Sequence, residues 1–249
     1  MISLSDIDVE LDGGKILGGV SFTSVADGVV AIMGPSGCGK STLLKALMGL
    51  VKCSGGQIKI GEKICDAAYW NTKQSIFTLV PQVPLLLPWL SLLDNIRLAG
   101  ESDKAKDEVT KKATDLLEIV GLSESGHLFP WQVSQGMAAR ASLARTLMIE
   151  SQVLLLDEPF AAIDATTRFR LQQWLLATIA KLKIQAMMVT HDPREALLIA
   201  DKIIVLRGRP AKVGNTFDLP ERSARNSPDW IFGEAAGQLE KQIRAALDG

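Results

Sequence analysis

The stretch Gly34-Pro35-Ser36-Gly37-Cys38-Gly39-Lys40-Ser41-Thr42 decides the fold of this chain. It matches the complete phosphate-binding loop motif G-x-x-x-x-G-K-S/T. An apolar, β-branched run at 29–33 precedes it, and a run typical of a helix at 43–48 follows. Because the motif requires a strand before it and a helix after it, this segment predicts a binding site for a nucleoside triphosphate.

The residue types of the loop fit this chemistry. Gly34, Gly37 and Gly39 permit unusual backbone dihedrals and let amide N–H groups approach a polyphosphate. Those amides and the positive end of the following helix form an anion site. Lys40 can reach the β- and γ-phosphates, and the Ser41 hydroxyl can bind the Mg²⁺ that accompanies the nucleotide.

Composition and charge limit the classes of protein that are compatible with the sequence. A chain of 249 residues suits one large domain or two small ones. Its 27 Lys and Arg against 28 Asp and Glu, with no long basic run, disfavour a nucleic-acid partner. The three cysteines, at 38, 53 and 65, have no metal-ligand spacing and are expected to be reduced thiols of a cytosolic protein.

The hydrophobic content gives two further expectations. The chain has no pattern typical of a signal peptide, and no run of about 18 apolar residues that would span a bilayer. Yet 47% of its residues are hydrophobic and its mean hydropathy is +0.18. Such values indicate either a strand-rich core or apolar surface that a partner covers.

The order of the patterns predicts an α/β fold. Apolar β-branched runs at 29–33, 153–156, 186–190 and 203–206 alternate with helical patterns, as in a mostly parallel sheet covered by helices. Segments 2–11, 21–26 and 57–64 alternate polar and apolar residues, which suits a separate antiparallel β subdomain. The pattern between 92 and 145 is helical and predicts an inserted α-helical subdomain. The last 35 or so residues resemble a loose extension that ends in an amphipathic helix at 234–247.

Polar residues follow three of the predicted strands. Asp157 and Glu158 end the run at 153–156; Asp157 is a candidate Mg²⁺ ligand, and Glu158 a candidate base for the attacking water, a role typically worth ~10² to 10⁴ in rate. His191 follows another buried run and can hydrogen-bond a γ-phosphate. Gln82 follows the strand-like segment 76–80 and can orient the water or complete the metal shell. These residues complete a predicted phosphate-cleaving site.

The order of the motifs resembles the ATP-binding cassette family. The motifs are residues 34–42, Gln82, 133–137, 153–159, 162–164 and His191. The resemblance implies a RecA-like P-loop NTPase cassette over 1–210, with the helical subdomain at about 84–144 and an extension at 211–249. It implies that two cassettes enclose two ATP molecules head to tail. Ser134, Gln135 and Gly136 would then face the γ-phosphate held by the other subunit, and Asp164 would link the two sites.

Within the family the chain is similar to nitrate, sulfonate and taurine importers, through segments 84–95, 157–164 and 191–206. This resemblance implies membrane-spanning permease subunits, a solute-binding protein and a peripheral position on the cytoplasmic face of the membrane. The apolar cluster 85–90 lies between prolines. It is expected either to be buried under the helical subdomain or to dock on a membrane subunit.

Two departures from the family pattern affect the expected activity. The family usually has the signature Leu-Ser-Gly-Gly-Gln, or a close variant, where this chain has residues 133–137. Three of the five residues differ here: Val133, Gln135 and Met137. If position 135 needs positive φ, the change from Gly costs on the order of 1 kcal/mol and predicts slowed hydrolysis. The adenine-stacking aromatic is also missing, since Phe22 is the only aromatic residue before the loop. Stacking on a base is worth ~1 to 3 kcal/mol, so weak base discrimination is expected.

Three other functions remain open from the sequence. The first is a soluble cassette that serves DNA repair or chromosome structure, although the chain has neither a long coiled-coil insertion nor a basic face. The second is a small-molecule kinase built on the same loop, for which the segment Ser134 to Arg140 would have no use. The third is a cassette that binds ATP as a structural switch with little hydrolysis.

Overall fold

The computed structural model describes residues 1–65, 76–100, 105–149, 151–225, 230 and 233–248. The strands are β1 (Ile2–Leu11), β2 (Gly14–Thr23), β3 (Val29–Met33), β4 (Gly55–Ile60), β5 (Lys63–Ile64), β6 (Phe77–Val80), β7 (Val153–Asp157), β8 (Gln185–Val189), β9 (Lys202–Arg207) and β10 (Lys212–Asp218). The helices are α1 (Lys40–Leu47), α3 (Leu92–Arg97), α4 (Lys106–Ile119), α5 (Gln135–Leu147), α6 (Ala165–Leu182), α7 (Pro193–Ile199), α8 (Arg222–Arg225) and α10 (Glu234–Asp248), with 3-10 turns η1 (Ser123–Ser125) and η2 (Pro130–Gln132).

The main sheet has six strands in the order β10-β9-β3-β8-β7-β6. All neighbours are parallel except β10 and β9. Side chains alternate between two cores: Val153 and Leu155 pack with α1 and the smaller sheet, whereas Leu154 and Leu156 pack with α5 and α6. Strands covered on both faces read as continuous apolar runs, which is why the sequence pattern predicted them.

The smaller, antiparallel sheet has the order β2-β1-β4-β5. The strand expected at 21–26 is misplaced, because β2 begins at Gly14. Asp12 and Gly13 both have positive φ, 51° and 76°, and join β1 to β2 through the pair Leu11 and Gly14. This is the geometry of a type I′ turn, for which Asp-Gly is a preferred sequence.

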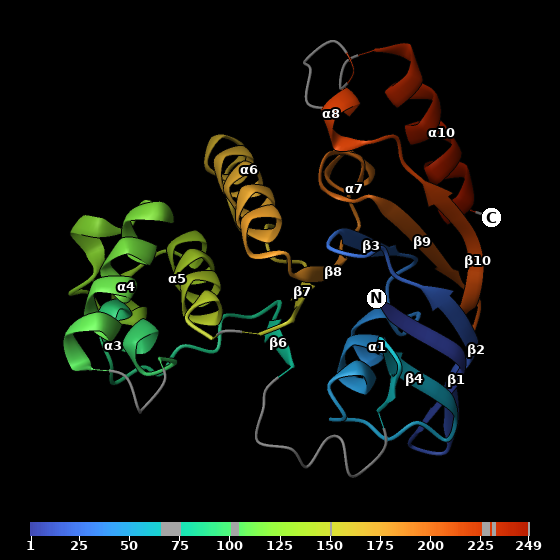
Figure 1. Ribbon diagram of the computed structural model, residues 1–249, viewed down its shortest axis with the longest axis horizontal. Helices are drawn as coiled ribbons and strands as arrows, with labels where there is room; N and C mark the ends of the chain where they lie inside the picture. The colour runs from blue at the N-terminus through green and yellow to red at the C-terminus, as the bar shows by residue number, and fades with distance from the viewer. Residues whose placement is uncertain (66–75, 101–104, 150, 226–229, 231–232, 249) are drawn as a thin grey trace.

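The helical subdomain lies to one side of the main sheet, where α3, α4 and α5 form a group and α6 stands between this group and α7 (Figure 1). The apolar side of α4, with Ala113, Leu116 and Leu117, is buried in the same core as Leu154 and Leu156. The predicted α/β fold with an inserted helical subdomain is thus confirmed. Among the described residues no helix has both the length and the apolar character needed to cross a bilayer.

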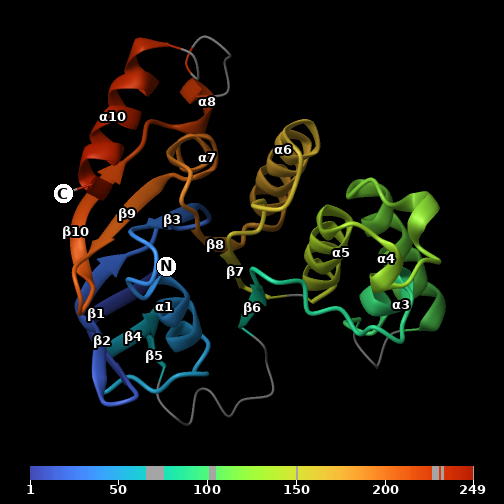
Figure 2. The same cartoon turned by 180° about the vertical axis from the view of Figure 1, so that it is seen from behind.

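The segment after residue 210 is not a loose extension at its start. Strand β10 pairs with β9 and extends the main sheet, and α10 packs along α7 and β9, as both views show (Figures 1 and 2). The amphipathic helix expected at 234–247 is present as α10. The division of the chain at 210 and 211 into a cassette domain and an extension stays a prediction.

Asp201 ties this C-terminal segment to the middle of the main sheet. Its carboxylate accepts hydrogen bonds from the Val29 backbone N–H at 2.8 Å, from Arg222 Nε at 2.8 Å and from Arg225 Nη2 at 3.1 Å. Arg225 is only 2% exposed, and burial lowers the pKa of its guanidinium. Asp201 therefore compensates a buried charge.

We expect Asp201→Ala to destabilise the fold by about 3 kcal/mol, because it leaves Arg225 buried without its carboxylate. The free energy of unfolding from denaturant titration measures this loss. The control is Asp218→Ala, since Asp218 pairs with Lys202 at 3.2 Å but is largely exposed, and an exposed pair is worth less than about 1 kcal/mol. Equal losses in the two variants would contradict the anchoring role of Asp201.

Candidate functional site

The predicted site residues lie at one edge of the main sheet, where its parallel strands end. In the register of the sheet Val189 lies beside both Ile32 and Asp157, and Leu156 lies beside Val80. The phosphate loop follows β3, the two carboxylates end β7, and His191 and Gln82 follow β8 and β6. The topology therefore gathers residues that are up to 157 positions apart in the sequence, from Gly34 to His191.

The phosphate loop has a backbone that only glycine fits at two points. Gly34 has φ 153°, and a Cβ there would lie 2.6 Å from the Leu206 carbonyl oxygen. Gly39 has φ 111°, and a Cβ there would lie 2.9 Å from Ile16 Cγ2. The loop curls around Lys40, whose Nζ donates to the carbonyls of Gly34 at 2.7 Å and Pro35 at 2.8 Å. The ammonium is thus held inside the loop that is predicted to bind phosphate.

The predicted metal ligands Ser41 and Asp157 are in direct contact, through a hydrogen bond between their side chains. Burial raises the pKa of the Asp157 carboxyl, this hydrogen bond opposes the rise, and the neighbouring Glu158 adds to it. Hydroxyl and carboxylate oxygens are suitable ligands for Mg²⁺, which typically takes few protein ligands and the rest from phosphates and water. Accordingly, no group of three or more His, Cys, Asp and Glu side chains that would hold a metal occurs in the described part of the chain.

The three predicted catalytic residues meet at one carboxylate oxygen. Glu158 Oε2 lies 3.2 Å from His191 Nδ1 and 3.4 Å from Gln82 Nε2. Glu158 has φ 48°, a left-handed conformation that costs a non-glycine residue about 1 kcal/mol or more. Its backbone N–H donates to the Val189 carbonyl at 3.0 Å, which attaches this strained residue to β8. Strain of this kind is typical of functional positions.

The signature segment, residues 133–137, contains the start of α5. Ser134 is the N-cap residue, and its hydroxyl accepts a hydrogen bond from the Met137 N–H at 3.2 Å. Gln135 is the first helical residue and does not have positive φ. The backbone strain that a positive φ would cause at this position is therefore absent. Gly136 is needed for close packing, because a Cβ there would lie 2.9 Å from the Ala162 carbonyl oxygen.

The signature and the phosphate loop of one chain do not form a single site. In both views the helix that follows the signature, α5, lies well apart from α1, which follows the loop (Figures 1 and 2). Ser134 and Gln135 are exposed. Asp164 is the N-cap residue of α6 and accepts from the Thr167 N–H at 3.0 Å, and this bond is the main cause of the lowered pKa of Asp164.

The apolar cluster 85–90 is partly buried and partly exposed. Leu86 packs against the core of the helical subdomain, whereas Leu85, Trp89 and the preceding Val83 are each more than 60% exposed. Fully buried Asn95 braces the loop: its Oδ1 accepts from the Leu87 N–H at 2.7 Å and its Nδ2 donates to three loop carbonyls. The sequence reasoning missed Asn95, although its position four residues after Ser91 at a helix start is a usable signal.

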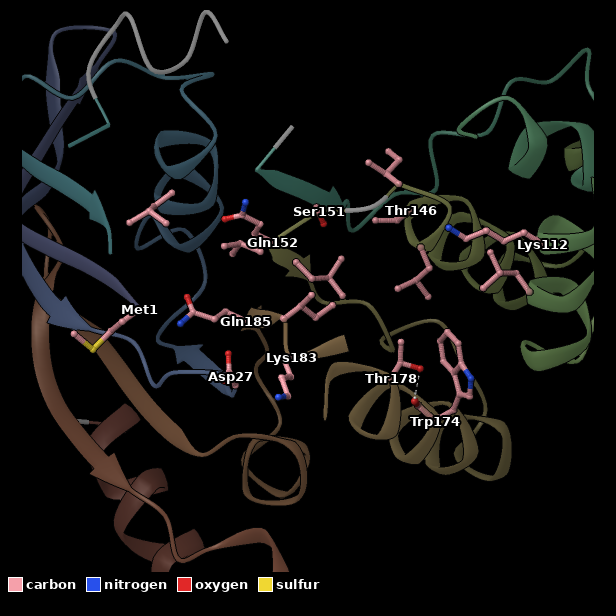
Figure 3. A pocket seen from close by; sticks show the side chains of 17 residues that line it. Met1, Asp27, Lys112, Thr146, Ser151, Gln152, Trp174, Thr178, Lys183 and Gln185 are labelled. Atoms are coloured by element: carbon pink, nitrogen blue, oxygen red, sulfur yellow. Dashed lines mark hydrogen bonds between the residues drawn. The ribbon is translucent and has the colours of Figure 1, made fainter. Parts of the chain in front are cut away.

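A cavity of about 700 Å³ lies at the opposite edge of the main sheet (Figure 3). It opens beside Gln152 and Gln185, at the starts of β7 and β8, and Trp174 of α6 lines its far side. No predicted site residue lines it. The candidate site therefore lies outside this cavity, and the phosphate loop and the polar side chains at the carboxyl ends of the strands define it.

The strand, the glycine-rich loop, the helix and the two carboxylates together define a P-loop nucleotide-binding site. The sequence profile of the ABC transporter family matches residues 17–161. The chain is 35% identical to the aliphatic sulfonates import ATP-binding protein SsuB 1 of Pseudomonas aeruginosa, over 97% of both chains. It is 34% identical to the taurine import ATP-binding protein TauB of Rhizobium johnstonii, over 92% of this chain and 87% of that protein.

Solved structures agree with this assignment. A bacterial ABC transporter cassette in dimeric form superimposes with a TM-score of 0.80 at 26% identity, over 89% of this chain and 100% of that one. A dimeric cassette in a post-hydrolysis state, bound to ADP and Pi, gives a TM-score of 0.78 at 25% identity, with the same coverage. The chain belongs to the ABC transporter family. It is an ATP-binding ATPase cassette, as the sequence predicted.

Asp157→Asn is expected to stabilise the nucleotide-free protein at pH 7 and to raise its Tm, because burial raises the pKa of the Asp157 carboxyl and so disfavours its ionised form. A carboxyl whose pKa is raised by folding contributes stability at low pH and loses it as the pH rises through the folded pKa. The gain should therefore vanish below the ordinary aspartate pKa of about 4. Calorimetry from about pH 3 to pH 8, a range that extends below this pKa, measures the gain. Asp115→Asn on the exposed side of α4 is the control, and a variant less stable than its parent at pH 7 would contradict the argument.

GTP is expected to compete with ATP within about tenfold, because the aromatic residue expected to stack on adenine is missing and an aliphatic contact in its place does not distinguish the polar edges of the two bases. Ile16 packs against the loop instead, where a Cβ at Gly39 would touch its Cγ2. Competition of unlabelled nucleotides against labelled ATP measures the ratio. A preference for ATP above about a hundredfold would refute this prediction.

Proposed function

We propose that this chain is the ATP-hydrolysing subunit of a solute importer, and that it works as a Mg²⁺-dependent head-to-tail homodimer. The strongest support is the contact of His191 and Gln82 with one oxygen of Glu158, at the edge of the sheet from which the phosphate loop leaves. Binding a nucleotide needs no such group. Activating water against a phosphate does.

The binding roles follow from charge. Lys40 and the loop amides bind the β- and γ-phosphates, as the buried position of the ammonium in the loop supports. Ser41, Asp157 and Gln82 hold Mg²⁺, directly or through water. When bound, Mg²⁺ neutralises charge that develops on the phosphates.

The catalytic roles follow from the contacts of Glu158. Its carboxylate polarises the attacking water and accepts the proton, a contribution typically worth ~10² to 10⁴ in rate. His191 hydrogen-bonds the γ-phosphate and Gln82 orients the water. His191 and Gln82 both contact one oxygen of Glu158. Loss of the γ-phosphate therefore changes the contacts of the same carboxylate that promotes its cleavage.

The dimer completes the site. Ser134 and the amides of Gln135 and Gly136 lie at the positive end of α5, which suits an anion, but α5 lies apart from α1, the helix that follows the loop of the same chain (Figure 1). We infer that they bind the γ-phosphate held by the other subunit, and that Asp164 links the two sites. The dimeric cassettes that resemble this chain support the arrangement. Because the backbone of Gln135 is unstrained, backbone strain at this position gives no reason to expect a binding-only switch.

A membrane partner accounts for the exposed apolar side chains. Val83, Leu85 and Trp89 follow Gln82 on the loop that Asn95 braces, so they offer a rigid apolar surface beside the catalytic site. We propose that permease subunits dock there, on the cytoplasmic face of the membrane, and that a solute-binding protein delivers the solute. The named relatives import aliphatic sulfonates and taurine, so we propose a small solute of the nitrate, sulfonate and taurine class.

The experiment compares Glu158→Gln, Lys40→Ala and the control Glu118→Gln, which lies exposed on α4. Glu158→Gln should bind ATP like the parent, release phosphate about a hundredfold more slowly and remain a dimer with MgATP. Lys40→Ala should lose ATP binding, and Glu118→Gln should change nothing. Phosphate release, nucleotide binding and light scattering measure the three properties. Hydrolysis by Glu158→Gln at the parental rate would refute the proposed base, and transfer of phosphate to a small molecule would identify a kinase.

A further inference from the structure

Three buried polar side chains from three different segments meet at Glu195, and one of them, Thr190, directly precedes His191 in the chain. Glu195 on α7 accepts a hydrogen bond from Gln172 Nε2 of α6 at 3.0 Å through its Oε1. Its Oε2 accepts a hydrogen bond from the Thr190 hydroxyl, in the turn after β8. All three side chains are less than 10% exposed. We call this cluster the polar trio.

The buried carboxylate of the polar trio lowers the stability of the fold. Burial raises the pKa of Glu195 above its ordinary value, and the hydrogen bonds from Thr190 and Gln172 oppose that rise only in part. An apolar side chain at position 195 would fill the same space without this cost. A carboxylate that the fold holds at such a cost needs a reason beyond packing.

One end of the polar trio fixes the backbone that carries His191. The Thr190 hydroxyl donates to Glu195 and accepts from the Asp192 N–H at 3.1 Å, so it holds the residues on both sides of His191. The His191 side chain is itself 69% exposed, and the only hydrogen bond of its ring in the described structure is to Glu158 at 3.2 Å. The direction of the imidazole therefore depends on the turn rather than on packing around the ring.

The other end of the polar trio lies on the helix that Asp164 caps. Gln172 is one helical turn beyond Arg168, whose Nη2 donates to the Ile163 carbonyl at 2.8 Å, next to Asp164. Arg168 and Glu195 also line one small cavity of about 60 Å³ together with Glu158 and His191. The helix backbone of α6, the polar trio and the turn that carries His191 thus connect the start of α6 to the catalytic carboxylate.

We propose that Glu195 is a positioning residue for ATP hydrolysis, which holds His191 against Glu158 by tying Thr190 to Gln172. This inference rests on the proposed role of His191. It adds that the position of α6, and with it Asp164, is transmitted to the imidazole through the Glu195 carboxylate. Glu195 touches neither the nucleotide nor the water.

The test is a double-mutant cycle between Glu195→Leu and His191→Ala, with steady-state phosphate release as the readout. Glu195→Leu should lower kcat by about tenfold to a hundredfold and leave KM for ATP unchanged, since a misplacement of about 1 Å can cost 10² in rate. The double variant should be no slower than His191→Ala alone. Glu195→Gln should recover most of the loss, because the Gln172 amide can turn to pair with the new side chain.

Gln185→Leu is the matched control. Gln185 is buried at the start of β8, the strand that Thr190 follows, and its Nε2 donates to the Val25 carbonyl at 3.2 Å. Its replacement also removes a hydrogen bond made by a buried side chain, so it should lower Tm without changing kcat. If Glu195→Leu does not fold, Thr190→Val removes one hydroxyl from the polar trio at nearly constant volume, and the same cycle applies.

The outcomes separate the two proposals. If His191→Ala hydrolyses ATP like the parent, the proposed role of His191 is wrong. If His191→Ala is slow and Glu195→Leu slows it further by the factor seen in the parent, the two residues act independently and the positioning role is overturned. A loss of kcat in Gln185→Leu equal to that in Glu195→Leu would also overturn it, because the effect would then be one of general stability.

Discussion

The carboxyl ends of four parallel strands share one edge of the main sheet, and every feature of the site depends on this constraint. Strand β3 delivers the phosphate loop, β7 the two carboxylates, β8 the imidazole and β6 the glutamine. The register leaves little freedom, because each strand is buried on both faces and a slip of one residue would exchange its two sets of side chains. Glu158 shows how firmly the edge is held: it keeps a left-handed backbone while two side chains reach one of its oxygens.

The partly or largely buried carboxylates fall into two groups, of which one stabilises the fold and the other lies where the proposed chemistry takes place. Asp201 is surrounded by partners and anchors the C-terminal segment to β3. Asp157 and Glu195 have pKa values raised by burial, so each costs the fold some stability in its ionised form. Both of these carboxylates lie beside the proposed site. This distribution agrees with the general observation that stability is often sacrificed where function needs a charge.

Local motifs made much of the site predictable from the sequence. The phosphate loop, the Asp157–Glu158 pair and His191 each follow a recognisable apolar run, and the topology of a parallel sheet brings such ends together. The Asp12-Gly13 turn was also a usable signal, but four glycines between 13 and 19 concealed β2. The polar trio was not predictable, because Gln172 and Glu195 are 23 residues apart and their contact depends on how α6 and α7 pack. The backbone of Gln135, by contrast, had a usable signal, because Ser134 is a preferred N-cap residue and places Gln135 at the first helical position of α5.

The central claim is that one catalytic site is built from two subunits, the loop of one and the signature of the other. Complementation between two inactive variants tests it most directly. Lys40→Ala disables the loop and Ser134→Arg the signature, so neither homodimer should hydrolyse ATP. A mixture of the two contains heterodimers with one intact Lys40 facing one intact Ser134, and the account predicts that phosphate release returns on mixing. A mixture that stays as inactive as its separate components, although light scattering shows that heterodimers form, would contradict it.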